Sequence, residues 1–115
     1  MRKQAYSILV HNNPGLLSRM AGLFSRRGYN IESITAGTTA DPRFTRITIV
    51  ASGDEQILSQ IEKQVRKMED VIDIKLLNTT NSVCRELMMI KIRANASQRA
   101  EIISVSDIFR AKIVD

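Results

Sequence analysis

The hydrophobic residues of the first 77 positions repeat with a period that switches between two and about 3.6, and the order of these switches strongly constrains the fold. Alternating stretches, typical of strands, cover residues 3–11, 30–39, 43–52 and 71–77. Helical repeats cover residues 15–27 and 54–68. The order β-α-β-β-α-β is that of the split βαβ, ferredoxin-like arrangement. We therefore predict an α+β fold with both helices on one face of an antiparallel sheet.

Turn residues separate these segments, and the two periods predict which side chains are buried. Gly28 is placed to end the first helix as a C-cap glycine, and Asp41-Pro42 to connect a hairpin. The predicted core of the strands contains Tyr6, Ile8, Val10, Ile47, Ile49, Ala51, Ile72, Ile74 and Leu76. The predicted core of the helices contains Leu16, Leu17, Met20, Ala21, Leu23, Phe24, Ile57, Leu58, Ile61, Val65 and Met68.

After residue 78 the same pattern begins again and is incomplete. We predict a first domain at 1–78, a linker at 79–84 and the start of a second domain at 85–115. The second domain would contain a strand at 85–93, a helix at 98–110 capped by Ser97, and the start of a strand at 112–115. Because half of such a unit leaves its apolar face open, we expect that face to pack on another surface.

Composition and charge narrow the protein class. The chain has a formal net charge of +5 at pH 7, which permits an acidic partner. Cys84 is the only cysteine, so no internal disulfide forms, and we expect a reducing, cytoplasmic environment. No apolar run approaches the roughly 20 residues of a membrane span, and the N-terminus shows no leader pattern.

The sequence offers no catalytic or metal-binding pattern. His11 is the only histidine, and no nucleophile-and-base pair can be assembled around it or around Cys84. The spacings H-x-x-x-H, C-x-x-C and D-x-D are absent from the sequence. We interpret His11 and Cys84 as structural residues and predict a chain without catalytic or metal-ligating residues.

RNA binding is the alternative that the element order itself raises, because RNA-recognition motifs share the βαββαβ order. Those motifs stack bases on spaced aromatic residues of the central strands. The matching strand here, residues 43–50, reads RFTRITIV. It lacks the glycine and the spaced aromatics, which argues against RNA binding.

The segment Asn12-Asn13-Pro14-Gly15 lies where a strand passes directly into a helix. Free N–H groups at a helix N-terminus attract an anion, and Gly15 lets a ligand approach the backbone closely. Because no nucleotide-binding glycine motif is present, the carboxylate of a small metabolite fits better than a phosphate. The alternative is that this segment is an ordinary turn.

This loop resembles the effector loop of ACT domains, which are amino-acid-sensing modules of βαββαβ fold. Segments that carry a closer resemblance are GLLSRMAGLFSRRGYNIESIT (15–35), RITI (46–49), VID (71–73), RELMMIKI (85–92) and IFRAKIVD (108–115). Across nearly the whole chain, the sequence resembles the small regulatory subunit family of acetolactate synthase, also called acetohydroxyacid synthase. Relative to that family, the second ACT-like domain is incomplete at Asp115.

The resemblance implies a subunit without catalytic residues. Such a subunit binds the large catalytic subunit, stimulates it and confers feedback inhibition by valine in isoleucine and valine biosynthesis. Thiamine diphosphate, magnesium and FAD belong to the large subunit, so we expect no cofactor on this chain. The resemblance also implies that two ACT domains pair edge to edge as a homodimer with valine between them. The implied effector contacts are Asn12, Gly15, Leu16 and Leu17 of one chain, and Asn30 and Ile31 of the partner chain.

Two questions stay open at the level of sequence. A stand-alone ACT module that senses an amino acid for another enzyme would carry the same loop. Valine, leucine and isoleucine all fit the residues, because one methylene changes affinity by only about 1–3 kcal/mol.

The segment 30–39 contains only one charged residue, Glu32, so we also predict pairing of two copies along this edge.

Overall fold

The computed structural model describes residues 2–78 and 80–114. Met1, Thr79 and Asp115, at which predicted segments begin or end, lie outside the described residues. The chain divides into two compact units, residues 1–84 and 85–115.

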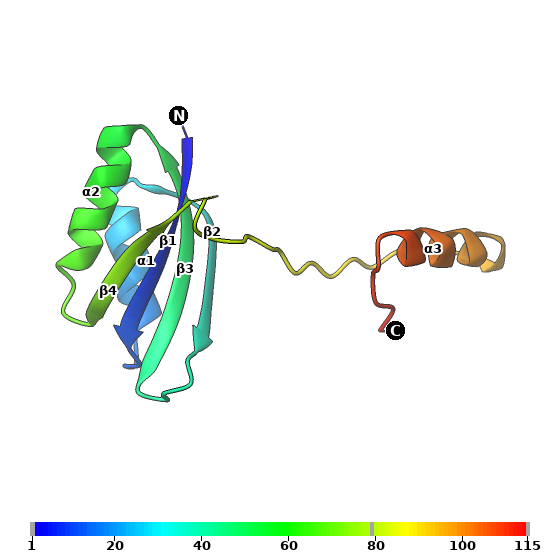
Figure 1. Cartoon of the computed structure of the whole chain (residues 1–115), viewed down its shortest axis with the longest axis horizontal. Coiled ribbons are helices and arrows are strands. Elements are labelled where there is room, and N and C mark those ends of the chain that lie inside the picture. Colours follow the sequence, from blue (N-terminus) through cyan, green and yellow to red (C-terminus); the bar gives the residue numbers. More distant parts are fainter. Residues whose placement is uncertain (1, 79, 115) are drawn as a thin grey trace. The chain divides into compact units, whose positions relative to one another are not determined.

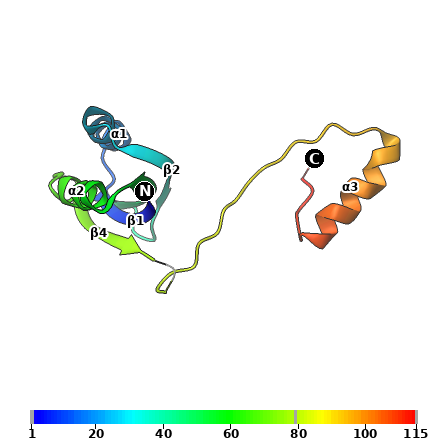
Figure 2. The same cartoon turned by 90° about the horizontal axis from the view of Figure 1, so that it is seen from above.

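The first unit has the predicted element order. It contains β1 (Arg2–His11), α1 (Leu16–Arg27), β2 (Asn30–Thr38), β3 (Phe44–Gly53), α2 (Glu55–Arg66) and β4 (Val71–Leu77). The strands form one sheet in the order β2-β3-β1-β4, in which all neighbours are antiparallel. Figures 1 and 2 show both helices on the same face of this sheet. The predicted α+β, ferredoxin-like βαββαβ fold is confirmed.

The strand register determines which residues share an end of the sheet. His11 lies opposite Phe44, and Thr38 lies opposite Thr45, so β1 and β2 both finish at one end. Asn30 lies opposite Ser52 at the other end, where β1 begins. Because β1 and β2 run in the same direction, the loop after β1 and the start of β2 are separated by the length of the sheet.

The core lies between the sheet and the two helices. Its strand residues follow the predicted alternation, and the largest of them is Tyr6, which is fully buried. The Tyr6 hydroxyl donates a hydrogen bond of 2.8 Å to the Leu58 carbonyl of α2, and burial raises the pKa of the Tyr6 phenol to about 12. The sheet and α2 are therefore joined by packing and by one buried polar contact.

Four residues that the sequence pattern places in the core are exposed in the structure. On α1, Leu17 and Ala21 are exposed, because the buried stripe runs through Leu16, Met20, Leu23 and Phe24 instead. On β4, Ile72 and Leu76 are exposed, and only Ile74 is buried. β4 is an edge strand with a register irregularity opposite Leu9 and Val10, so part of its apolar surface has no neighbour.

The second unit contains α3 (Ala96–Ile108) and differs from the sequence prediction at three points. Residues 85–93 are extended but do not form a strand, because no neighbouring strand in this unit accepts their hydrogen bonds. Residues 112–114 likewise contain no strand. The helix N-cap is Asn95 rather than Ser97: the Asn95 side chain accepts from the Gln98 N–H at 3.0 Å, and the Gln98 side chain accepts from the Asn95 N–H at 3.2 Å.

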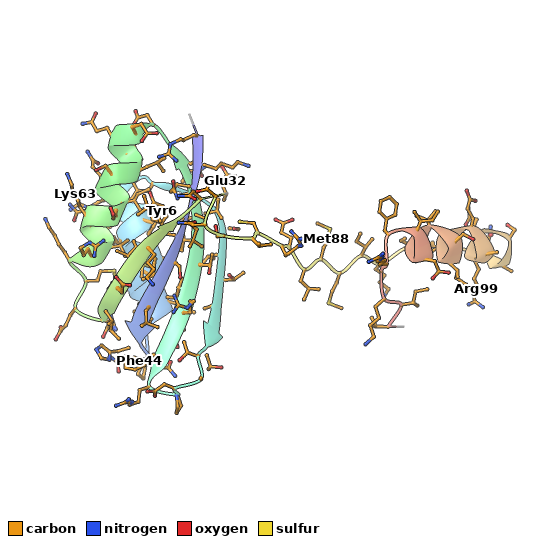
Figure 3. All side chains as sticks on the ribbon, in the orientation of Figure 1. Tyr6, Glu32, Phe44, Lys63, Met88 and Arg99 are labelled. Carbon is orange, nitrogen blue, oxygen red and sulfur yellow. The ribbon has the colours of Figure 1, made fainter. Side chains whose placement is uncertain are left out.

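No residue of α3 is buried, and the extended segment before it exposes a row of apolar side chains. Met88 is 68% exposed, and its side chain stands away from the chain in Figure 3. The apolar face that the sequence pattern leaves open in this unit is therefore exposed among the described residues.

Candidate effector-binding site

α1 begins with unsatisfied backbone donors. Gly15 is the N-cap residue and adopts the left-handed conformation, with φ of +78° and ψ of 3°, which a side chain would strain. The Leu16 N–H donates to the Asn13 carbonyl at 3.3 Å, and the Arg19 N–H to the Gly15 carbonyl at 3.0 Å. Between them, the N–H groups of Leu17 and Ser18 find no acceptor in the described part of the chain. No acidic residue lies in this first turn, so none of its own side chains would repel an anion.

The side chains of the two candidate asparagines, Asn12 and Asn30, are each held by hydrogen bonds from the amide nitrogen. The Asn12 Nδ2 donates to the Pro42 carbonyl at 3.4 Å. The Asn30 Nδ2 donates to the Ser52 Oγ at 2.8 Å and to the Glu32 carboxylate at 3.1 Å. The amide oxygens of both residues accept no hydrogen bond from the described residues. Each side chain is therefore oriented by its donor group while its acceptor oxygen remains available.

The two leucines at the start of α1 have different surroundings. Leu16 is buried in the core, whereas Leu17 is 49% exposed although it was also expected in the helix stripe. A half-exposed leucine beside open N–H groups can contact the apolar part of a small ligand. Leu16 instead anchors the first turn of the helix to the core.

The candidate residues of one chain do not gather at one point. Asn12, Gly15, Leu16 and Leu17 lie at the end of the sheet where β1 finishes, whereas Asn30 and Ile31 begin β2 at the opposite end. Asn30 lines a shallow surface hollow there with Tyr29 and Ser52. A single chain therefore presents the candidate residues in two separate groups, which we call candidate half-sites.

The structure adds Asp70, a contact of the loop that the sequence did not indicate. The Asn13 Nδ2 donates to the Asp70 carboxylate at 2.7 Å, and Arg19 forms an ion pair with the same carboxylate. These bonds from Asn13 and Arg19 hold the pKa of the Asp70 carboxyl below its ordinary value. Asp70 is 57 positions from Asn13, so no local sequence signal connects the two residues.

His11 and Cys84, which we interpret as structural residues, are both exposed. His11 lies at the end of β1, and its ring centroid lies 5.7 Å from that of Phe44. Across residues 2–78 and 80–114, no three His, Cys, Asp or Glu side chains come together as a metal site. In the same residues, none of the helices has the length and apolar character needed to cross a membrane.

Comparison with known families relates this geometry to a class of proteins. Residues 6–73 match the family described as the AHAS small subunit-like ACT domain. Residues 85–115 match the family described as the small subunit of acetolactate synthase. The chain belongs to the acetolactate synthase small-subunit family. The ACT match contains the loop after β1 and the start of β2, so both half-sites lie within the family domain.

Individual small subunits of this family are close in sequence. The chain is 50% identical over 110 residues to the probable acetolactate synthase small subunit of Methanothermobacter thermautotrophicus, covering 95% of this chain and 66% of that protein. It is 46% identical over 113 residues to the acetolactate synthase isozyme 3 small subunit of Escherichia coli, covering 98% and 69%. The chain thus spans about two thirds of the length of these relatives.

Solved structures agree on the fold. The acetolactate synthase small subunit of Thermotoga maritima matches with a TM-score of 0.85 at 34% identity, over 100% of this chain and 72% of that chain. The ACT domain of a GTP pyrophosphokinase from Chlorobium tepidum matches with a TM-score of 0.53 at 20% identity, over 65% of this chain and 96% of that chain. The second likeness concerns the fold alone.

Proposed function

We propose that this chain acts as a non-catalytic regulatory subunit of acetolactate synthase, which binds the catalytic subunit, stimulates it and transmits feedback inhibition by valine. Membership of the small-subunit family is the observation that carries the proposal. On this proposal thiamine diphosphate, magnesium and FAD belong to the catalytic partner, and this chain supplies the effector site.

The start of α1 supports a site for the carboxylate of an amino acid. The N–H groups of Leu17 and Ser18 have no acceptor among the described residues, and the positive end of the helix dipole favours an anion at this position. Gly15 has no side chain to block the approach of a ligand. The valine carboxylate would accept from these two donors.

The other two groups of valine also have candidate contacts. The ammonium requires acceptors, and the amide oxygens of Asn12 and Asn30 accept no other hydrogen bond from the described residues. The isopropyl group would contact the half-exposed side chain of Leu17 and that of Ile31 from the second copy, which is partly buried in each chain.

A two-fold dimer through β2 would bring the two half-sites together. β2 is an edge of the sheet and its residue Ile34 is 41% exposed. If two β2 strands pair antiparallel about their middle, Asn30 of one copy lies opposite Thr38 of the other. Thr38 is at the end of the sheet where the loop after β1 begins. We expect a homodimer, and light scattering that shows a monomer at all concentrations would contradict it.

Reconstitution tests the function. The catalytic subunit of acetolactate synthase from the same organism is assayed alone and with this chain, and the mixture is titrated with valine, leucine and isoleucine. The proposal expects stimulation by the chain and inhibition that is strongest with valine. If the chain neither binds nor stimulates the catalytic subunit but still binds an amino acid, it is a stand-alone ACT module for another enzyme.

A further inference from the structure

Asp70 connects the turn between α2 and β4 to the loop that precedes α1. Its backbone carbonyl accepts from the His11 N–H at 2.8 Å, at the end of β1. Its carboxylate accepts from the Asn13 Nδ2 at 2.7 Å and pairs with Arg19 in the second turn of α1. Only 14% of the Asp70 side chain is exposed. Three consecutive parts of the chain, the end of β1, the loop and α1, thus contact this one residue.

Arg19 extends these contacts to the residue before Gly15. While one of its guanidinium nitrogens pairs with Asp70, the other, Nη1, lies 3.4 Å from the Pro14 carbonyl as a hydrogen-bond donor. Asn13 and Pro14 are therefore both held from the side of α1 and Asp70. The backbone at these two positions determines how the chain enters Gly15, and so the direction in which the Leu17 and Ser18 N–H groups point.

We propose that Asp70 is a positioning residue for the effector loop, which it holds in the conformation that binds the effector carboxylate. This inference rests on the proposed function, because it assigns a role in that same site. Asp70 touches no effector atom in this proposal. It acts through Asn13 and Arg19, and it reduces the ordering that binding would otherwise have to impose on the loop.

The test measures binding of L-valine to the intact chain by titration calorimetry, well below the unfolding temperature of each variant. Asp70→Asn keeps an oxygen that can accept from Asn13 but removes the charge that pairs with Arg19. Asp70→Ala removes both contacts. Glu69→Gln is the matched control, because Glu69 is exposed and makes no hydrogen bond or ion pair within the described residues. Tyr6→Phe controls for lost stability, since it removes the buried hydrogen bond to the Leu58 carbonyl.

We expect a graded loss of valine affinity, about threefold for Asp70→Asn and about tenfold for Asp70→Ala. Glu69→Gln and Tyr6→Phe should bind valine as the unmodified chain does, although Tyr6→Phe unfolds at a lower temperature. In a double-variant cycle, Arg19→Gln should add less to the loss in Asp70→Asn than it causes alone, because the two residues act as a pair.

The outcomes separate this inference from the proposed function. If the unmodified chain binds valine and both Asp70 variants bind it equally well, Asp70 does not position the loop and the proposed function stands. If the unmodified chain binds no valine, both proposals are wrong. If Asp70→Ala does not fold, Asp70→Asn decides the question: unchanged affinity overturns the inference, and reduced affinity with an unchanged control supports it.

Discussion

α1 and α2 lie in the same layer but begin in chemically different ways at opposite ends of the sheet. At α2 the Asp54 side chain accepts from the Ile57 N–H at 2.8 Å, and Glu55 places a second carboxylate in the first turn. At α1 the N-cap is Gly15, with no side-chain hydrogen bond and no acidic residue in the first turn. The start of α2 thus carries a side-chain acceptor and an acidic residue, whereas the start of α1 carries neither.

α1 is nevertheless stable without an N-terminal cap, because packing and its C-terminus hold it. Four of its residues are buried. Gly28 ends the helix at φ of +67°, and its N–H donates to the Ser25 carbonyl at 3.2 Å. α3 shows the reverse, with a complete capping box and no buried residue. Capping and packing are thus independent contributions, and a helix with good packing can leave its N-terminus open for binding.

The largest expected effect comes from placing a negative charge at the open helix start. Gly15→Asp puts a carboxylate at the position proposed for the effector carboxylate. At an effective dielectric constant of 20, two such charges about 4 Å apart repel by about 4 kcal/mol, which is about a thousandfold in affinity. We expect a subunit that still stimulates its catalytic partner but no longer transmits valine inhibition, measured by valine titration of the reconstituted enzyme.

Two variants separate charge from backbone strain in this experiment. Gly15→Asn has nearly the same size as Gly15→Asp but no charge, so it should retain more valine inhibition. Gly15→Ala strains the same left-handed position without adding a charge or a polar atom, so its valine titration measures the effect of the strain and the added Cβ alone. Full inhibition with Gly15→Asp would place the site elsewhere, and simultaneous loss of stimulation would make the loop structural.

Removing the cap of α2 should lower the stability of the first unit. Asp54→Ala removes the acceptor of the Ile57 N–H, a loss that typically costs about 1 kcal/mol. We expect a lower unfolding temperature, measured by thermal denaturation. An unchanged unfolding temperature would show that this cap does not stabilise the helix.

A smaller effect on binding is expected at the second half-site. On the proposed function, Asn30→Ala removes one acceptor of the charged ammonium, worth about 1.5 kcal/mol, so inhibition should require about tenfold more valine. Ser33→Ala, an exposed change on the same strand, serves as the control. Equal titrations for both variants would remove Asn30 from the site.

The smallest effect is the loss of stability that we expect when the pH is lowered. A hydrogen bond from Arg2 lowers the pKa of Glu55 at the start of α2, and bonds from Asn13 and Arg19 lower that of Asp70 beside α1. Because its pKa is lower in the folded state, each carboxylate contributes stability at pH values above its ordinary pKa, which is 4.5 for Glu55 and 3.8 for Asp70. This contribution is lost as the pH falls through the lowered pKa. Melting temperatures should therefore fall as the pH is lowered below 4.5 for Glu55 and below 3.8 for Asp70, and they should fall less steeply in Glu55→Gln and Asp70→Asn.

Much of the fold was predictable from local patterns. The alternation of Tyr6, Ile8 and Val10 predicted the buried face of β1, and Gly28 predicted the end of α1. The predictions failed where tertiary neighbours decide. Leu17 fits the helical period but lies outside the buried stripe, and residues 85–93 have the strand pattern without a strand to pair with. The N-cap of α3 is Asn95 rather than the predicted Ser97, because Asn95 and Gln98 exchange side-chain-to-backbone hydrogen bonds.

By itself the sequence determined the order of the elements, the glycine at the start of α1 and the residue types of the candidate site, because φ preference and hydrophobic period depend on neighbours along the chain. Tertiary structure alone decided how those residues are distributed. Strand order and register set Asn12 and Asn30 at opposite ends of the sheet and brought Asp70 to Asn13. Such contacts join residues far apart in sequence, and they form only when the apolar faces of the sheet and helices are buried together.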